Sequence, residues 1–282
     1  MKIGLVLEGG GMRGLYTAGV LDVMMEHQFM PDVVCGTSAG VTFGVNLLSQ
    51  QKGRVLRYNC RYAGDRRYIS LHSWLTTGNM INRDFAYDLL PHELDPFDEE
   101  TFEQSKAAFY ATITNMRTGQ AEYVRITNTW QQMDVIRASA SLPIICQPVE
   151  WQGEKYLDGG LVDNIPLDKC IGLGCDKIII VLTRPLEYVR NDHIAGACRL
   201  FYPRYKALLR AIEQRNDRYN ARLQQIRRLE QEGKVFVLRP SENISVGRLE
   251  KDVARLQALH QLGVADATRL WNNLTHYLSR II

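Results

Sequence analysis

The sequence lacks an apolar run long enough to cross a membrane, which would need about 20 residues. The N-terminal apolar stretch, residues 3–7, is interrupted at once by Glu8 and is too short for the apolar region of a signal peptide. We therefore expect a cytoplasmic protein whose contact with a membrane, where it makes one, is peripheral.

The sequence also lacks paired cysteines. Its six cysteines are scattered, and none has Cys-x-x-Cys spacing. Cys35, Cys146 and Cys170 lie in apolar stretches and are typical of small core residues. In a chain of this length such cysteines need no disulfide framework, and the pattern favours a reducing compartment.

A strong charge of one sign is missing as well. The net charge is only +3 over 282 residues, which gives no reason to expect a nucleic-acid partner. Repeats and low-complexity segments are absent, while 45% of the residues are hydrophobic and 23% are charged. This composition fits one large α/β domain or two small ones.

The most informative stretch that is present is residues 32–40. A short apolar strand runs into Gly36-Thr37-Ser38-Ala39-Gly40, and an apolar helical pattern follows through residue 47. This is the pattern of a nucleophile elbow, in which a sharp strand-to-helix turn presents the serine above the sheet. The alternative is an ordinary turn in which Ser38 caps the helix.

A second glycine-rich turn follows the first strand, in the run Glu8-Gly9-Gly10-Gly11-Met12-Arg13-Gly14. The spacing formally matches a dinucleotide fingerprint, but that site needs an acid near the end of the second strand, and Asp32 lies at its start. We favour an oxyanion hole made by the backbone N–H groups of Gly9, Gly10, Gly11, Met12, Arg13 and Gly14, with a positive charge from Arg13.

The hydrophobic periodicity predicts a parallel sheet covered by helices. Strands are expected at residues 3–7, 32–35, 107–115, 122–127, 144–149, 153–157 and 177–183, with a late one at 235–238. Helices are expected at residues 15–27, 41–47, 54–62, 81–90, 133–140, 166–173 and 253–278. Residues 50–106 either cap a site or form a plain helical insertion, and we favour the insertion.

Residues 199–228 combine helical apolar spacing with strong basic character. They contain nine lysines and arginines against two acids, Glu213 and Asp217, an excess of seven positive charges. A basic amphipathic helix can lie on an anionic membrane surface. The commoner alternative, which we favour, is a docked helix whose outer face is solvated.

Asp158-Gly159-Gly160 follows a short predicted strand. Asp-Gly pairs are common in plain turns, but a carboxylate at a strand end can also face a reaction centre. The histidines that follow, His193, His260 and His276, do not lie at a strand end before a turn, as a triad histidine would. We therefore consider a site without histidine, in which Asp158 takes the serine proton.

The glycine-rich run at residues 9–14, the elbow at residues 36–40 and the Asp-Gly-Gly at residues 158–160 carry a family resemblance. In this order they resemble the motifs of the patatin-like phospholipases, most closely the bacterial branch. The resemblance covers roughly residues 1–185 and includes Ala138-Ser139-Ala140-Ser141-Leu142-Pro143 and Asn164-Ile165-Pro166-Leu167. It implies a three-layer α/β/α fold with a mostly parallel central sheet, in a hydrolase domain of residues 1–185. Residues 186–282 are then a mostly helical C-terminal region packed on that domain.

The resemblance also implies roles and chemistry. Ser38 is the nucleophile, Asp158 the general base, and the amides of residues 9–14 the oxyanion hole; Gly36, Thr37, Ala39 and Gly40 form the elbow, and Gly159 and Gly160 complete the base motif. The substrate is a lipid ester, and no metal or cofactor is implied. Because a carboxylate of ordinary pKa is a weak base, we expect Asp158 to be buried with a raised pKa.

Two further hypotheses stay open beside the lipid acyl hydrolase. One is an esterase or thioesterase for short, soluble acyl substrates, with the same chemistry. The other is a lipid-binding module that has kept the fold without turnover, against which an intact Ser38 and Asp158 argue.

Overall fold

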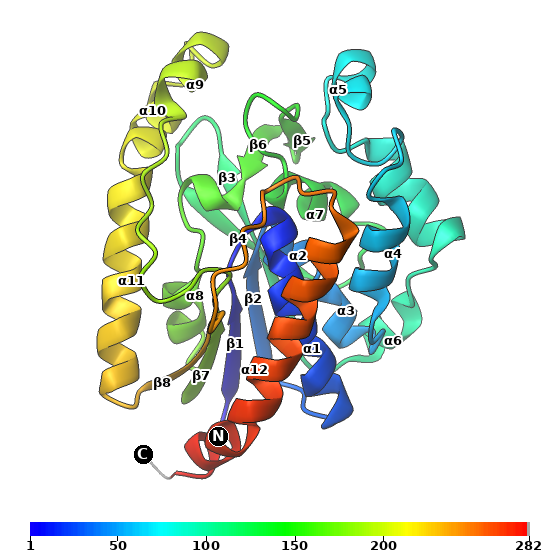
Figure 1. Ribbon diagram of the computed structural model, residues 1–282. Coiled ribbons are helices and arrows are strands. Elements are labelled where there is room, and N and C mark those ends of the chain that lie inside the picture. The colour runs from blue at the N-terminus through cyan, green and yellow to red at the C-terminus, as the bar shows by residue number, and fades with distance from the viewer. Residues whose placement is uncertain (281–282) are drawn as a thin grey trace.

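The computed structural model describes residues 1–280 and centres on one eight-stranded sheet (Figure 1). The strands lie in the order β5-β6-β3-β2-β1-β7-β8, and β4 pairs with β3. Their bounds are β1 Ile3–Leu7, β2 Val33–Thr37, β3 Ala108–Asn115, β4 Ala121–Ile126, β5 Val149–Trp151, β6 Glu154–Asp158, β7 Lys177–Val181 and β8 Val235–Leu238. The strands β3, β2, β1, β7 and β8 pair in parallel, and β4, β5 and β6 are antiparallel additions.

The helices are unequal in length. The longer ones are α1 Leu15–Glu26, α4 Arg54–Tyr62, α10 Lys206–Glu213, α11 Arg215–Gln231 and α12 Val253–Ser279. The shorter ones are α2 Ala39–Thr42, α3 Val45–Leu48, α5 Leu71–Thr77, α6 Glu99–Gln104, α7 Met133–Ser139, α8 Leu167–Gly172 and α9 Ala195–Phe201. A π-helix spans Phe85–Leu94, and the 3₁₀ turns η1 Gly11–Gly14 and η3 Gly159–Leu161 follow β1 and β6.

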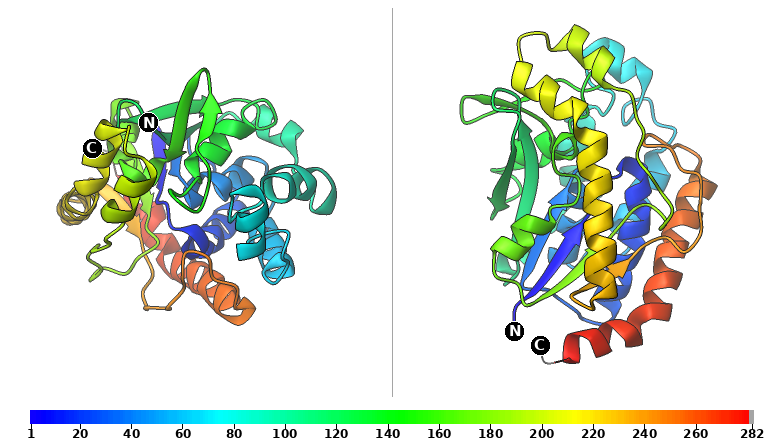
Figure 2. Two further views of the ribbon diagram at one scale, coloured as in Figure 1. Left: turned by 90° about the horizontal axis from the view of Figure 1, so that it is seen from above. Right: turned by 90° about the vertical axis from the view of Figure 1, so that its left-hand side faces the viewer.

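The strands alternate their apolar side chains between two helical layers. Leu5 and Leu7 of β1 pack into a core with α1 and α12, whereas Val6 packs on the opposite face with α8 and α11. Figures 1 and 2 show α11 on one side of the sheet and α1 with α12 on the other. The expected three-layer α/β/α architecture is therefore confirmed.

The last helix crosses α1 at very short range. A Cβ on Gly19 would lie 2.2 Å from the carbonyl oxygen of His260, and a Cβ on Gly263 would lie 2.1 Å from that of Tyr16. Only glycine at both positions lets the two backbones approach so closely. This contact fixes α12 against the domain core, and β8 adds a further C-terminal element to the sheet.

Several predicted elements need correction. Residues 199–228 do not form one helix but belong to α9, α10 and α11, with breaks around Pro203, which has no N–H for a helix, and at Gln214. The helix predicted at 41–47 is two short helices. Within the segment 81–90, residues 85–90 are π-helical rather than α-helical, and they belong to the π-helix Phe85–Leu94, which also contains Pro91.

The strand predicted at residues 144–149 is also wrong, since only Val149 belongs to a strand. Ile144 has a φ of 73°, a conformation that a β-branched residue rarely adopts. Its N–H donates to the Tyr202 hydroxyl at 2.9 Å, and its carbonyl accepts from the Trp74 indole at 3.3 Å. Side chains from two distant segments therefore satisfy this loop in place of a neighbouring strand.

Candidate active site

Ser38 lies at the sharp turn between β2 and α2, with a φ of 55° and a ψ of −119°. The turn needs its glycines: a Cβ on Gly36 would lie 2.5 Å from the Gly40 carbonyl oxygen, and a Cβ on Gly40 would lie 2.4 Å from that of Leu7. Ser38 stands at the N-cap position of α2, but its hydroxyl makes no capping bond. The geometry is that of an elbow rather than of an ordinary cap.

The strand register brings Asp158 to Ser38. Thr37, the last residue of β2, pairs with Thr112 of β3, and the next β3 residue, Ile113, pairs with Asp158. β2 and β6 therefore lie one after the other along the same edge of β3, and their last residues are neighbours. The Ser38 hydroxyl donates to Asp158 Oδ2 at 2.7 Å.

Asp158 is 3% exposed and held on several sides. Its Oδ1 accepts the Gly160 N–H at 2.7 Å, and its backbone carbonyl accepts the Thr114 hydroxyl at 2.9 Å. Burial raises the pKa of Asp158, while the bonds from Ser38 and Gly160 and the positive charges of Arg215 and Arg248 act in the opposite direction. The overall rise of this pKa is the direction of shift that a general base needs.

Gly159 and Gly160 follow the carboxylate in a crowded turn. A Cβ on Gly159 would lie 2.3 Å from the Thr112 carbonyl oxygen, and a Cβ on Gly160 would lie 2.3 Å from Asn164 Oδ1. The backbone can therefore fold back under Asp158 only without side chains at these two positions.

Ser139 of α7 is a site residue to which the sequence assigned no role. Its hydroxyl accepts the N–H of Ser38 at 2.9 Å and donates to the carbonyl of Thr112 at 2.7 Å. It is fully buried and ties the elbow to β3. The signal was present in the segment Ala138–Pro143, where residue types alone do not show which serine faces the elbow.

The glycine-rich loop lies over the elbow. Within it, the Gly9 N–H donates to the Asn164 carbonyl at 3.1 Å and the Met12 N–H to the Arg248 carbonyl at 3.0 Å. The N–H groups of Gly10 and Gly11 have no acceptor among the residues that the structure describes. Two amides thus remain available to a ligand oxygen beside Ser38.

The acids near this loop do not fit a nucleotide. Asp32 accepts the Ile3 N–H at 2.6 Å, at the end of the sheet opposite the glycines. Glu8 is 1% exposed, and its carboxylate accepts the Tyr219 hydroxyl at 2.6 Å and the Thr183 N–H at 2.6 Å. Glu8 therefore anchors the glycine loop to α11 and to the end of β7.

Arg13 is buried beside the same loop. One of its terminal nitrogens reaches the Val246 carbonyl at 3.4 Å. Burial, together with the positive charges of Arg184 and Arg248, lowers the pKa of Arg13 to about 10, which leaves it positively charged at neutral pH.

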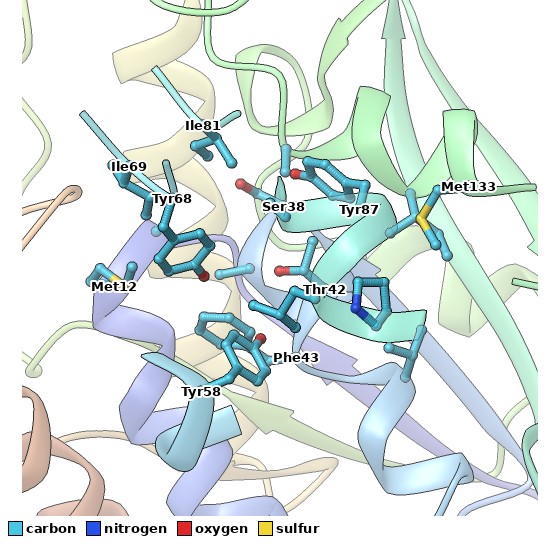
Figure 3. A pocket seen from close by; sticks show the side chains of 18 of the residues that line it. Met12, Ser38, Thr42, Phe43, Tyr58, Tyr68, Ile69, Ile81, Tyr87 and Met133 are labelled. Carbon is cyan, nitrogen blue, oxygen red and sulfur yellow. The ribbon is translucent and has the colours of Figure 1, made fainter. Parts of the chain in front are cut away.

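An apolar cavity opens on one side of Ser38 (Figure 3). It holds about 960 Å³ of empty space, a figure that includes its open mouth. Figure 3 shows Ser38 between Tyr68 and Tyr87, with Phe43 and Tyr58 beneath. Such a lining suits an apolar chain attached to a group that reacts at Ser38.

Residues 50–106, for which a plain insertion was favoured, form much of this lining. Tyr58, Tyr68, Ile81, Tyr87 and Leu90 all face the cavity. The π-helix and the segment around α5 thus act as a wall of the site, so the cap hypothesis describes them better.

The late histidines are remote from Ser38. His260 is buried between α12 and α1, where its Nε2 lies 2.8 Å from Asp22 Oδ2. His193 and His276 are exposed, and none of the three lines the cavities around Ser38. Asp158 is therefore the titratable group within hydrogen-bond distance of the serine.

Within residues 1–280, no three His, Cys, Asp or Glu side chains lie close enough together to hold a metal ion. Across the same residues, no helix combines the length and the apolar character that a membrane span requires.

The basic region 199–228 is largely docked and paired. Tyr219, Leu223 and Ile226 of α11 pack against the sheet. Arg199 pairs with Glu213, and Arg222 pairs with Asp168. The favoured interpretation as a docked helix holds for α11, whereas α9 leaves Leu200 and Phe201 exposed.

Comparisons with known proteins give two family models and several similar proteins. The family model "Patatin-like phospholipase" matches residues 5–171, and a model for a domain of unknown function (DUF6363) matches residues 205–279. The "Uncharacterized protein YjjU" of Escherichia coli is 31% identical over 192 residues, which are 66% of this chain and 53% of YjjU.

Lysophospholipases are among the other relatives. "Lysophospholipase nte1" of Aspergillus niger is 32% identical over 211 residues, 69% of this chain and 13% of its own. "Lysophospholipase NTE1" of Saccharomyces cerevisiae is 31% identical over 214 residues, 71% of this chain and 12% of its own. This chain thus spans about half of YjjU and about an eighth of the lysophospholipases. Among solved structures, VipD from Legionella pneumophila aligns with 96% of this chain and 67% of its own at 15% identity, with a TM-score of 0.45.

Proposed function

Because the chain belongs to the patatin-like phospholipase family, we propose that it is a serine hydrolase that cleaves the carboxylic ester bonds of lipids. The observation that carries the proposal is the 2.7 Å hydrogen bond from the Ser38 hydroxyl to Asp158, at the junction of an apolar cavity and a glycine-rich loop. The alignment with lysophospholipases supports the same substrate class.

In the proposed mechanism, Ser38 Oγ attacks the ester carbonyl while Asp158 Oδ2 takes the hydroxyl proton. The tetrahedral intermediate collapses to an acyl-serine, and the protonated Asp158 returns the proton to the leaving alcohol. Asp158 then takes a proton from a water molecule that attacks the acyl-serine, and it returns this proton to Ser38 Oγ as the bond between Oγ and the acyl carbon breaks and the fatty acid is released. The raised pKa of Asp158 strengthens it as a base for both steps.

The oxyanion hole is proposed at the N–H groups of Gly10 and Gly11. They are free among the described residues, while those of Gly9 and Met12 are engaged elsewhere. Gly11 has a φ of 58°, and a Cβ there would lie 2.5 Å from the Arg248 carbonyl oxygen, so the loop requires glycine. Loss of one such donor typically lowers the rate about a hundredfold or more.

The apolar cavity is the proposed site of the acyl chain. Its lining of tyrosine, phenylalanine, leucine and isoleucine favours a long acyl chain over a short, soluble acyl group. This observation ranks the lipid hydrolase above the short-chain esterase or thioesterase. The bonded pair Ser38–Asp158 ranks both above a binding module without turnover.

Peripheral membrane contact is proposed at the tips of α5 and α9 rather than along all of 199–228. Leu71 and Leu75 of α5 are 60% and 71% exposed, and Leu200 and Phe201 of α9 are 80% and 53% exposed. Figures 1 and 2 show both helices at the end of the molecule where the parallel strands finish. An apolar surface at this end suits an enzyme that draws its substrate from a lipid surface.

The division of the chain near residue 185 is kept as a proposal. It is supported by the two family models, which match residues 5–171 and 205–279. The C-terminal part is nevertheless closely joined to the rest, through β8 in the sheet and α12 on α1.

The decisive experiment is hydrolysis of p-nitrophenyl esters of increasing chain length by the wild type, Ser38→Ala and Asp158→Asn. We expect turnover that rises with chain length, and loss of activity in both variants while their circular dichroism stays unchanged. Asp168→Asn, which alters an exposed carboxylate on α8, is the matched control and should stay active.

Other outcomes would redirect the proposal. If Asp158→Asn kept most of the activity, the base would lie elsewhere. A wild type inactive on all esters and on phospholipid vesicles would favour a binding module.

A further inference from the structure

A second cavity adjoins Ser38 and Asp158 and has a different character from the apolar one. It encloses about 380 Å³ of empty space beside the glycine-rich loop. Four arginines line it, namely Arg13, Arg190, Arg215 and Arg248, and Asp158 is the one carboxylate in its lining within the described residues. The catalytic pair thus lies between an apolar cavity and a cationic one.

Three of these arginines share one carboxylate outside the lining. Arg215 donates to both oxygens of Asp192, at 2.9 and 2.7 Å, and Arg248 donates to Oδ2 at 3.2 Å. Arg190 Nε lies 4.0 Å from the same oxygen. One negative charge therefore faces three positive ones, and an excess of positive charge remains at the cavity.

The buried arginines also retain unused donors. Arg190 is 6% exposed and Arg13 is 8% exposed. Arg190 Nε and Nη1 and Arg13 Nε are buried without a hydrogen-bond partner among the described residues. Buried donors of a charged group normally have an acceptor, and both arginines that carry these three donors line the cavity.

The Arg190 guanidinium is fixed in place for such a role. It lies over the ring of Tyr219, 3.6 Å from the ring centroid, and Tyr219 in turn bonds Glu8 beneath the glycine loop. The Arg190 backbone is held by Asn220, which accepts its N–H at 2.8 Å and donates to its carbonyl at 3.0 Å. A preorganised guanidinium pays little entropy on binding an anion.

We propose that this cationic cavity binds the phosphate of a phospholipid or lysophospholipid headgroup. The acyl chain then occupies the apolar cavity, and the ester carbonyl lies over Ser38 between them. Planar guanidinium groups match the oxygens of a phosphate, and the binding is charge-assisted. The inference rests on the proposed hydrolase function and adds its headgroup selectivity.

Three of the four arginines come from outside the part of the chain matched by the patatin-like model. Arg190, Arg215 and Arg248 all lie beyond residue 171, and Arg215 and Arg248 lie in the region 205–279. In this proposal the N-terminal part supplies the chemistry and the C-terminal part selects the headgroup.

The test compares two esters of the same medium-length acyl chain, a lysophosphatidylglycerol and a monoacylglycerol, both kept below their aggregation concentrations. The readout is the ratio of kcat/KM for the phosphate ester to that for the neutral ester. We expect this ratio to fall about tenfold or more in Arg190→Gln and in Arg248→Gln. Arg190→Lys, which keeps the charge, should recover part of it.

Arg228→Gln is the matched control, because Arg228 lies on the same α11 as Arg215 but is exposed and, among the described residues, pairs with Glu232 alone. Its ratio should equal that of the wild type. An equal fall of both kcat/KM values in Arg190→Gln and Arg248→Gln, at unchanged ratio, would overturn the headgroup assignment. Arg248 is partly exposed, so its variant serves if Arg190→Gln does not fold.

Binding of glycerol phosphate and of inorganic phosphate, measured by calorimetry, separates this inference from the proposed function. Glycerol phosphate binding that depends on Arg190 in an enzyme inactive on both esters would support the phosphate site and refute the hydrolase. Inorganic phosphate that binds without inhibiting lysophospholipid hydrolysis would show a site for free phosphate instead, and would overturn the headgroup proposal.

Discussion

The Ser139 hydroxyl accepts the backbone N–H of Ser38 at 2.9 Å and donates to the Thr112 carbonyl at 2.7 Å. The strained elbow is thereby fastened to β3, the strand whose register also places Asp158. Because the buried Ser139 hydroxyl both accepts and donates a hydrogen bond, it leaves Ser38 little freedom to move. The positive φ of Ser38 is stabilised from outside the turn.

Substitution of Ser139 by alanine should therefore lower both stability and rate. It would leave the Ser38 N–H and the Thr112 carbonyl buried with one partner fewer, which costs about 1–3 kcal/mol in the free energy of unfolding. We expect a reduced kcat with a smaller change in KM. Ser141→Ala is the control, because the Ser141 hydroxyl, just beyond α7, bonds the Arg137 carbonyl of that helix and no other group among the described residues. Equal effects of the two substitutions on kcat would contradict the positioning role.

The pH dependence of kcat/KM should report the raised pKa of Asp158. The base acts only when ionised, so the rate falls as the pH falls through the Asp158 pKa, and this limb should lie above the ordinary aspartate value of about 3.9. Arg248→Gln removes a charge that lowers this pKa, so the limb should move to higher pH. A limb at or below pH 4, or a shift to lower pH in the variant, would count against this assignment.

Asp158→Asn should make the protein more stable at neutral pH. Because burial raises the folded-state pKa, the ionised carboxylate destabilises the fold, and this cost is fully present above the folded pKa. It disappears as the pH falls below the unfolded value. In urea unfolding, the free energy of unfolding of the variant should thus exceed that of the wild type at pH 8, and this difference should shrink toward pH 4. A difference that stayed constant with pH would mean that the substitution acts through packing alone.

The elements that could be predicted from sequence are those whose signal is local. The strand and turn around Ser38 and the glycine-rich loop stand out because glycine spacing and apolar runs fix them within a few residues. The approach of Asp158 depends instead on the pairing of Ile113 with β6, which no short stretch encodes. Asp158 could be predicted from the two glycines that follow it and from the resemblance to the patatin-like phospholipases.

Features that depend on distant contacts could not be predicted. The loop at residues 144–148 looks like a strand, yet Tyr202 and Trp74 satisfy Ile144 from two other segments. The arginine cavity brings together Arg13, which follows β1, and Arg190, which follows β7, and the sequence shows each only as an isolated charge. Ser139 could not be distinguished from Ser141 for the same reason.

Met133 should influence acyl-chain preference. Its side chain lines the apolar cavity away from Ser38 in Figure 3. Met133→Trp adds bulk there, so we expect kcat/KM for long p-nitrophenyl esters to fall about tenfold relative to short ones, a loss of about 1.4 kcal/mol of selective binding. Met133→Leu, which nearly conserves volume, should leave the ratio unchanged. A uniform loss over all chain lengths would place the acyl chain elsewhere.

Binding to lipid vesicles should depend on the apolar tips of α5 and α9. Replacing Leu71, Leu75, Leu200 and Phe201 by serine removes side chains that would be buried in the bilayer interface, each contributing up to about 1.5–3 kcal/mol when fully buried. We expect sedimentation with vesicles to weaken at least about tenfold, while hydrolysis of monomeric short-chain esters stays within about twofold.

Varying the charge of the lipid provides a second test of membrane contact at the same surface. The exposed Arg204 and Lys206 lie just beyond α9, so anionic vesicles should bind better than zwitterionic ones, and the difference should shrink as salt increases. Leu186→Ser is the control, since Leu186 is 47% exposed but contacts Arg227 on α11, away from α5 and α9. If that substitution weakened binding as much as the changes on α9, contact would be made by another face, and the cavities at Ser38 would have to receive lipid from solution.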